Sequence, residues 1–245
     1  MTGLVRRLYR EARAVEAEGG FGVVLDDRPV RTPIKATLVV PARALAEAIA
    51  SEWAAQGEEV DPHAMPISRL ANTAIDLTGP RRDEIVAELG GYARTDLLCY
   101  RAGHPPDLAA RQQATWQPIL DWAADTFGGR LEVTSGVVYV DQPAASVAAC
   151  KAAVAALDDF ALTALKSAVE AAGSLVLGLA LVHGRLDAAA VFAASRLDEA
   201  YQVERWGEDG EAEKHARALA ADLEDTGRFL AFLPGERGGG GMEGG

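Results

Sequence analysis

Short hydrophobic runs alternate with turn-forming residues over the first forty positions of the chain. Apolar and β-branched side chains are concentrated in residues 14–18, 21–25 and 37–40. Gly19-Gly20 and Asp26-Asp27 separate these runs, and glycine and aspartate tolerate the backbone angles of tight turns. The pattern predicts short strands joined by hairpin turns in the first part of the chain.

From Pro41 onward the spacing of apolar residues is helical. Leu45, Ile49 and Trp53 recur at every fourth position and form one stripe, and the helix is expected to end at Gly57. Pro41 suits the first turn of this helix, where its missing N–H costs nothing. Because Trp53 lies on the same stripe as the two aliphatic residues, we expect it to be buried in the core of the N-terminal part.

The rest of the chain is predicted to be mainly helical, with two segments that the pattern leaves open. Residues 96–101 fit a strand or an irregular segment, and residues 131–140 fit two strands or one bulged strand. Helices are expected over residues 69–76, from Pro80 through Tyr92, over 105–127 with a kink at Pro118, over 143–157, over 160–182, through 191–206 and over 210–233.

The most apolar of these helices is the one predicted over residues 160–182. Its segment from Ala171 to Val182 carries no charged residue, but a helix needs ~17–25 apolar residues to span a bilayer and this segment is shorter. We therefore expect a helix in the centre of the core. Ser174 and Gly178 lie one turn apart and would allow a second helix to approach closely.

This order of elements predicts an α+β fold. A small β-rich N-terminal domain, residues 1–60, is followed by a mostly helical domain, residues 61–236, and the loop over 57–62 is the expected boundary. Six of the nine residues 237–245 are glycine, and this segment is expected to form a disordered tail. Whether the strands predicted over 131–140 join the N-terminal sheet is left open.

Composition and charge exclude several classes of partner. The formal net charge is −12, which repels phosphate backbones and anionic lipid, so no nucleic acid and no membrane surface is expected as a partner. Cys99 and Cys150 form neither a disulfide framework nor a metal motif, which suits a reducing compartment. The N-terminus has no apolar segment of the kind that follows the charges of a secretory signal.

Motifs for enzymatic chemistry are missing from the sequence. The four histidines are far apart, and no pair has the spacing of metal ligands. No phosphate-binding loop, dinucleotide fingerprint or nucleophile elbow is present. We therefore expect the protein to need no nucleotide, metal or organic cofactor.

One stretch near the C-terminal end places polar groups in an apolar setting. In a continuous helix, Glu199 and Gln202 share a face with Phe192 and Trp206. A carboxylate in such a stripe needs a partner, because burying an unpaired charge costs several kcal/mol. That partner could lie in this chain or in another protein.

Two further carboxylates of this stretch, Asp198 and Glu204, could imitate a catalytic pair with Glu199. Their helical positions, however, point in different directions, so the three groups do not converge on one substrate atom. We expect Asp198 and Glu204 on a solvated face. Glu199 is left open between a structural ion pair and a functional group.

Four motifs together resemble a known family. They are Trp53, the segment 69–76 with the sequence RLANTAID, the segment 95–101 with the sequence TDLLCYR, and the segment 195–207 with the sequence SRLDEAYQVERWG. This combination is similar to the assembly chaperones that handle the alpha subunit of F1-ATP synthase, over residues 5 to 230. The last motif is the most specific of the four.

The resemblance implies a chaperone without enzymatic activity. Such a protein would hold the unassembled alpha subunit until the beta subunit replaces it, and the family's functional acidic residue would fall on Glu199. The client-binding residues are then expected to be Glu199, Gln202 and Trp206. Asp198 and Ala200 stand where other members have acidic residues. No organellar targeting segment is evident, so the expected location is the bacterial cytoplasm.

A hydrolase that uses Glu199 with a second carboxylate is the alternative. A deep polar pocket with another carboxylate about 5–10 Å from Glu199 would favour it. An exposed apolar groove would instead favour the chaperone.

Overall fold

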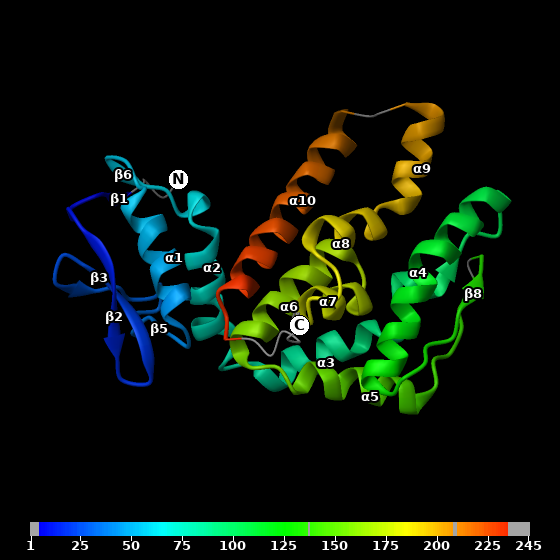
Figure 1. The fold of residues 1–245 in the computed structure, drawn as a ribbon, viewed down its shortest axis with the longest axis horizontal. Coiled ribbons are helices and arrows are strands. Elements are labelled where there is room, and N and C mark those ends of the chain that lie inside the picture. Colours follow the sequence, from blue (N-terminus) through cyan, green and yellow to red (C-terminus); the bar gives the residue numbers. More distant parts are fainter. Residues whose placement is uncertain (1–4, 137, 208–209, 235–245) are drawn as a thin grey trace, which may run out of the picture.

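The N-terminal part of the protein is a small antiparallel sheet, as the hairpin pattern predicts. The computed structural model describes residues 5–136, 138–207 and 210–234. Strand β2 (Ala12–Ala17) pairs with β3 (Gly20–Leu25), which also pairs with β4 (Arg28–Pro29) and β5 (Val39–Val40). A separate two-stranded ladder joins β1 (Val5–Arg6) to β6 (Glu59–Val60). Figure 1 shows these strands at one end of the molecule.

Helix α1 (Arg43–Ala54) packs on this sheet with Leu45 and Ile49 fully buried. The sequence predicts a helix that begins at Pro41 and ends at Gly57. The observed helix begins two residues later and ends three residues earlier. The expectation for Trp53 is also corrected, because its side chain is only partly buried at the edge of the N-terminal core. Trp53 lies in the last turn of α1, where the Tyr9 ring covers it edge-on at a centroid distance of 5.8 Å.

The rest of the described chain is mainly helical, which confirms the predicted α+β class. The N-terminal core is shared with this part, because Ile67, Ala164 and Phe229 belong to the same hydrophobic cluster as the sheet residues. The elements are η1 (Pro62–Ala64), α2 (Pro66–Thr73), the π-helix η2 (Ala74–Thr78), α3 (Arg82–Tyr92), η3 (Leu97–Cys99), β7 (Tyr100–Arg101), α4 (Pro106–Phe127), β8 (Thr134–Ser135), α5 (Ala144–Ala155), α6 (Asp159–Ala172), α7 (Leu175–Val182), α8 (Ala188–Ser195), α9 (Leu197–Trp206) and α10 (Gly210–Ala231).

Two helices that the sequence predicts as continuous are each divided in the structure. The apolar helix over 160–182 is α6 followed by α7, because Gly173 takes a left-handed backbone (φ 67°) and Ser174 caps α7 by accepting from the N–H of Leu177. The helix through 191–206 is α8 followed by α9, with the break at Arg196. This second break changes which residues share a face with Glu199.

The two segments left open by the sequence meet each other. Residues 96–101 form η3 and then β7, which pairs in parallel with β8 in the 131–140 segment. Within the described part of that segment only Thr134 and Ser135 form a strand, and they pair with β7, away from the N-terminal sheet. The glycine-rich tail predicted over 237–245 lies outside the described residues. None of the helices within the described ranges is long and apolar enough to cross a membrane.

The helical core is centred on the contact between α6 and α7. Gly178 of α7 faces α6 so closely that an added Cβ would lie 2.7 Å from Val169 Cγ2 and 2.9 Å from Leu165 Cδ1. The close approach predicted for this glycine is thus confirmed. All but one of the α7 residues are buried, and α3, α4, α6, α8 and α10 pack against this helix.

A carboxylate is buried at the start of α7. Asp96 is 0% exposed and accepts hydrogen bonds from the Ser174 hydroxyl (2.8 Å), the Val176 N–H (3.0 Å) and the Leu98 N–H (3.0 Å). Loss of hydration raises the pKa of Asp96, while these hydrogen bonds oppose that rise. The contacts fix the 95–101 segment against the first turn of α7.

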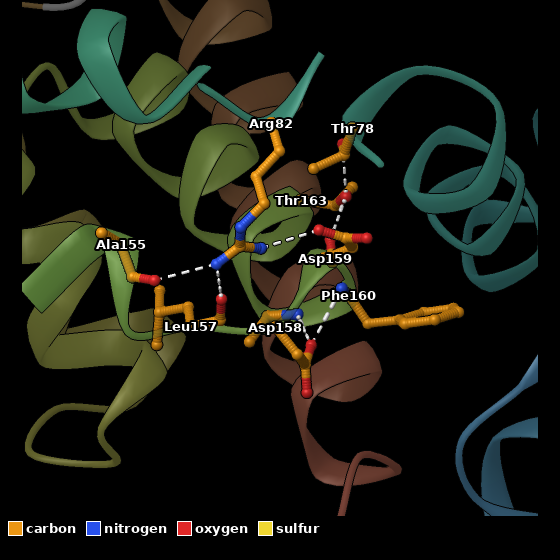
Figure 2. A network of polar contacts seen from close by, with 9 residues as sticks. Thr78, Arg82, Ala155, Leu157, Asp158, Asp159, Phe160 and Thr163 are labelled. Carbon is orange, nitrogen blue, oxygen red and sulfur yellow. Dashed lines mark hydrogen bonds and ion pairs between the residues drawn. The ribbon is translucent and has the colours of Figure 1, made fainter. Parts of the chain in front are cut away.

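A second polar network joins α3 to the ends of α5 and α6, and Figure 2 shows its geometry. The guanidinium of Arg82 pairs with Asp159 at 2.7 Å and donates to the carbonyl oxygens of Ala155 (2.9 Å) and Leu157. Asp158 caps α6, as its position before the helix predicts, by accepting from the N–H groups of Phe160 and Ala161. Arg82 therefore satisfies carbonyls at the end of α5 and a carboxylate at the start of α6.

Replacing Gly178 by alanine should destabilise the protein by about 1–3 kcal/mol, because the new methyl group would be forced into Val169 and Leu165. Gly91, near the end of α3, has no heavy atom within 4 Å of where an added Cβ would lie and provides the matched control. Gly91→Ala should leave stability unchanged or raise it by about 0.4–1 kcal/mol. Urea denaturation measures both, and equal midpoints for the two variants would contradict the close α6–α7 contact.

Candidate functional site

An open groove lies between α9 and α10, at the end of the molecule remote from the N-terminal sheet (Figure 1). Its volume is about 680 Å³. We call it the α9–α10 groove. Its lining residues are Arg196, Glu199, Ala200, Gln202, Val203, Trp206 and Gly207 from α9 and its ends, and Ala212, Glu213, Ala216 and Arg217 from α10.

The three residues that the sequence selects all line this groove. Glu199, Gln202 and Trp206 follow one another at intervals of three and four residues, so they share one face of α9. Trp206 has 77% of its surface accessible. The structure therefore brings the predicted residues together, as an exposed surface of α9.

Glu199 is partly exposed, and the partner of its carboxylate lies in this chain. Its side chain is 45% exposed and forms an ion pair with Arg196 at 2.9 Å. The break at Arg196 explains this exposure, because α8 with Phe192 no longer continues the stripe that a single straight helix would have made. Glu199 consequently needs no buried partner, and its carboxylate is available at the rim of the groove.

The groove combines exposed apolar side chains with charged ones. Val203 and Trp206 are exposed apolar side chains, and alanines of α9 and α10 also line the groove. On the α10 side Glu213 pairs with Arg217 at 3.1 Å, which parallels the Glu199–Arg196 pair on α9. Such a surface suits a polypeptide segment that buries apolar groups and places polar groups at the margins.

The opposite face of α9 lies against α4. Glu204 is 55% exposed, as expected of a solvated face, whereas Asp198 is only partly exposed. Asp198 accepts from the Gln112 side-chain amide at 2.7 Å. Glu204 accepts from Nη1 of Arg111 through both of its oxygens, at 2.9 and 2.8 Å. Both carboxylates therefore attach α9 to α4 and point away from the groove.

Tyr201 is the only buried residue of α9, all of which the structure describes, and its hydroxyl donates to the carboxylate of Asp107 at 2.9 Å. This hydrogen bond, followed by the charge of Arg205, holds the pKa of Asp107 below its ordinary value. Sequence patterns did not identify Asp107, Arg111 or Gln112. Their partners on α9 lie more than eighty positions away in the chain, so no local spacing could reveal them.

The described part of the chain shows neither a cluster of metal ligands nor a reactive thiol. Within residues 5–136, 138–207 and 210–234, no group of three histidine, cysteine or acidic side chains has metal-binding geometry. Burial raises the pKa of the Cys99 thiol to about 12 and that of Cys150 to about 11. Both thiols are therefore protonated and unreactive near neutral pH.

Comparison with known proteins identifies the class. The family described as ATP12 chaperone protein matches residues 6–124. The crystal structure of Atp12 from Paracoccus denitrificans is 46% identical, covers 94% of this chain and 99% of its own, and superposes with a TM-score of 0.91. A candidate chaperone from Agrobacterium tumefaciens is 40% identical, with 94% and 86% covered and a TM-score of 0.88.

A fungal relative extends the likeness beyond bacteria. The mitochondrial protein atp12 of Schizosaccharomyces pombe is 24% identical over 214 residues, which are 82% of this chain and 74% of the relative. These likenesses define the protein as a chaperone. The chain belongs to the ATP12 chaperone family, and the resemblance to chaperones of F1-ATP synthase assembly is confirmed.

Removing the exposed indole at the groove should not affect folding. Trp206→Ala should change the free energy of unfolding by less than about 0.5 kcal/mol, because the side chain is 77% exposed. Trp116 is the matched tryptophan in the core, 1% exposed, with its indole N–H donating to the Ala194 carbonyl at 2.8 Å. Trp116→Ala should cost about 3–5 kcal/mol. A comparable loss of stability in both variants would show that Trp206 is part of the packed core.

Proposed function

We propose that the α9–α10 groove binds the unassembled alpha subunit of F1-ATP synthase and shields it from aggregation until the beta subunit replaces it. The observation that carries the proposal is the exposed apolar surface of Val203 and Trp206 in a groove of an ATP12 family member. Exposed apolar side chains in a groove are typical of surfaces that bind another protein. No catalytic step is needed for such shielding.

The proposed role of Glu199 is to hold the client at the edge of the groove. Its carboxylate is half exposed in a groove with exposed apolar side chains and can accept a charge-assisted hydrogen bond from a donor on the client. Gln202, one turn further along α9, offers a neutral donor and acceptor on the same face. Trp206 supplies the largest apolar contact of the three.

The proposed setting is the bacterial cytoplasm. Cys99 and Cys150 are both free and buried, as suits a reducing compartment. The two solved relatives described above come from bacteria. The fungal relative is mitochondrial by name.

The groove gives no support to the hydrolase alternative. Its second carboxylate is Glu213, and each of the two carboxylates forms an ordinary ion pair with an arginine of the same helix or its boundary. The groove is open, and Val203 and Trp206 expose apolar surface in it. That combination fits a bound segment of polypeptide better than the two-carboxylate chemistry of hydrolysis.

The charge of Glu199 should matter for the client and hardly at all for the fold. Glu199→Gln should change the free energy of unfolding by less than about 1 kcal/mol, because an exposed ion pair contributes little. Binding of the alpha subunit should weaken, because the contact loses its charge assistance. The two measurements are the urea midpoint and the suppression of alpha-subunit aggregation at increasing chaperone concentration.

Tyr139→Ala provides the matched control for apolar exposure. Tyr139 is 55% exposed and does not line the groove. This variant should suppress aggregation as the unchanged protein does, whereas Trp206→Ala should not. Full protection by both Trp206→Ala and Glu199→Gln would place the client elsewhere on the surface and reject the proposal.

A further inference from the structure

Helix α9 is attached to the rest of the protein mainly through polar groups. Only Tyr201 is buried among its ten residues, all of them described. Arg196 interrupts the helix at its start, and Gly207 follows its end with a positive φ of 86°. An element with so little buried apolar surface is positioned by whatever specific contacts it makes.

Those contacts converge on the first two turns of α4, which lies beside α9 (Figure 1). Asp107 accepts from Tyr201 and pairs with Arg205, while Arg111 holds both oxygens of Glu204. Gln112 adds a hydrogen bond to Asp198, and its own carbonyl accepts from the buried Arg101. We call this set of contacts the α4 clasp.

The aromatic ring of Tyr201 strengthens the same contact. The guanidinium of Arg205 lies over it at 4.4 Å from the ring centre, and that of Arg111 at 5.3 Å. Cations at these distances are attracted to the ring face. The clasp therefore joins one hydroxyl, three carboxylates, an amide and two guanidiniums in a single network between two helices.

We infer that the α4 clasp sets the orientation of α9 and thereby the geometry of the α9–α10 groove, with Asp107, Arg111 and Gln112 as positioning residues for client binding. This inference rests on the proposed function of the groove. The clasp uses Asp198, Tyr201, Glu204 and Arg205, whereas the groove uses Glu199, Gln202, Val203 and Trp206. Because the two sets lie on different faces of α9, the clasp can act on the client only by placing the helix.

The test combines variants of the clasp with two independent measurements on the full chain. Arg111→Ala removes the ion pair with Glu204 and the cation over the Tyr201 ring, and Tyr201→Phe removes the hydroxyl that donates to Asp107. Neither residue lines the groove. Amide hydrogen exchange over residues 197–206 reports the attachment of α9, and equilibrium binding of isolated alpha subunit reports the groove. We expect faster exchange in this segment, little change in the unfolding midpoint, and binding about fivefold weaker because fewer molecules hold the competent orientation.

Swapping the charges of Arg111 and Glu204 between the two helices tests whether client binding can be restored. A nonspecific loss of stability would not be reversed by this swap. Arg111→Glu alone should weaken client binding, and the double variant with Glu204→Arg should restore it together with slow exchange in α9. Arg130→Ala is the matched control, because it removes an exposed ion pair to Asp121 on the same helix α4 and leaves the clasp intact. This control should match the unchanged protein in both measurements.

The outcomes separate the clasp from the proposed groove. Unchanged exchange in the clasp variants, or faster exchange with unchanged client binding, would overturn the inference. If the double variant Arg111→Glu with Glu204→Arg does not restore client binding, the inference is overturned as well. If Trp206→Ala and Glu199→Gln bind the client normally while the clasp variants bind it weakly, the groove is not the client site, and the proposed function fails.

Discussion

The carboxylate of Asp96, enclosed at the first turn of α7, is the interaction on which the helical part of the structure depends. Burying a charge costs several kcal/mol unless donors replace its water. Here the Ser174 hydroxyl and the N–H groups of Leu98 and Val176 take that place, next to the positive end of the helix dipole. Since α7 is almost completely buried, fixing its first turn also fixes what packs around it. Gly178 then allows α6 to approach, and the core extends outward from this pair of helices.

From this centre to the groove, the stabilising interactions change in kind. Around α7 they are apolar contacts and buried hydrogen bonds, such as the indole of Trp116 on the Ala194 carbonyl in α8. Beyond the break at Arg196, α9 buries only Tyr201 of its ten described residues and depends on exposed polar pairs. A rigid body thus carries a helix that is held less tightly. That arrangement suits a chaperone, which must bind a subunit and later give it up.

Local sequence patterns were sufficient for strands β2, β3 and β5, for the Leu45–Ile49 stripe of α1 and for the face of α9 that carries Glu199, Gln202 and Trp206. These features depend on spacing within a few residues, which a single sequence displays. The division at Gly173 and Ser174 had a signal, a glycine followed by a capping residue, but the apolar run concealed it. The break at Arg196 carried no such marker. The α10 side of the groove and the partners of α9 on α4 are brought to α9 by packing between segments that are far apart in the chain. The periodicity of a single sequence does not encode such packing.

Helix α9 divides its ten residues between two surfaces, and this division separates two kinds of selection on the sequence. Positions that face α4 must keep matched charges and the tyrosine ring, because a change on one helix requires a compensating change on the other. Positions that face the groove have no such obligation to the fold, and substitutions there alter only the exposed surface that we propose as the client site. Recognition can therefore diverge through a handful of exposed positions while the scaffold stays the same.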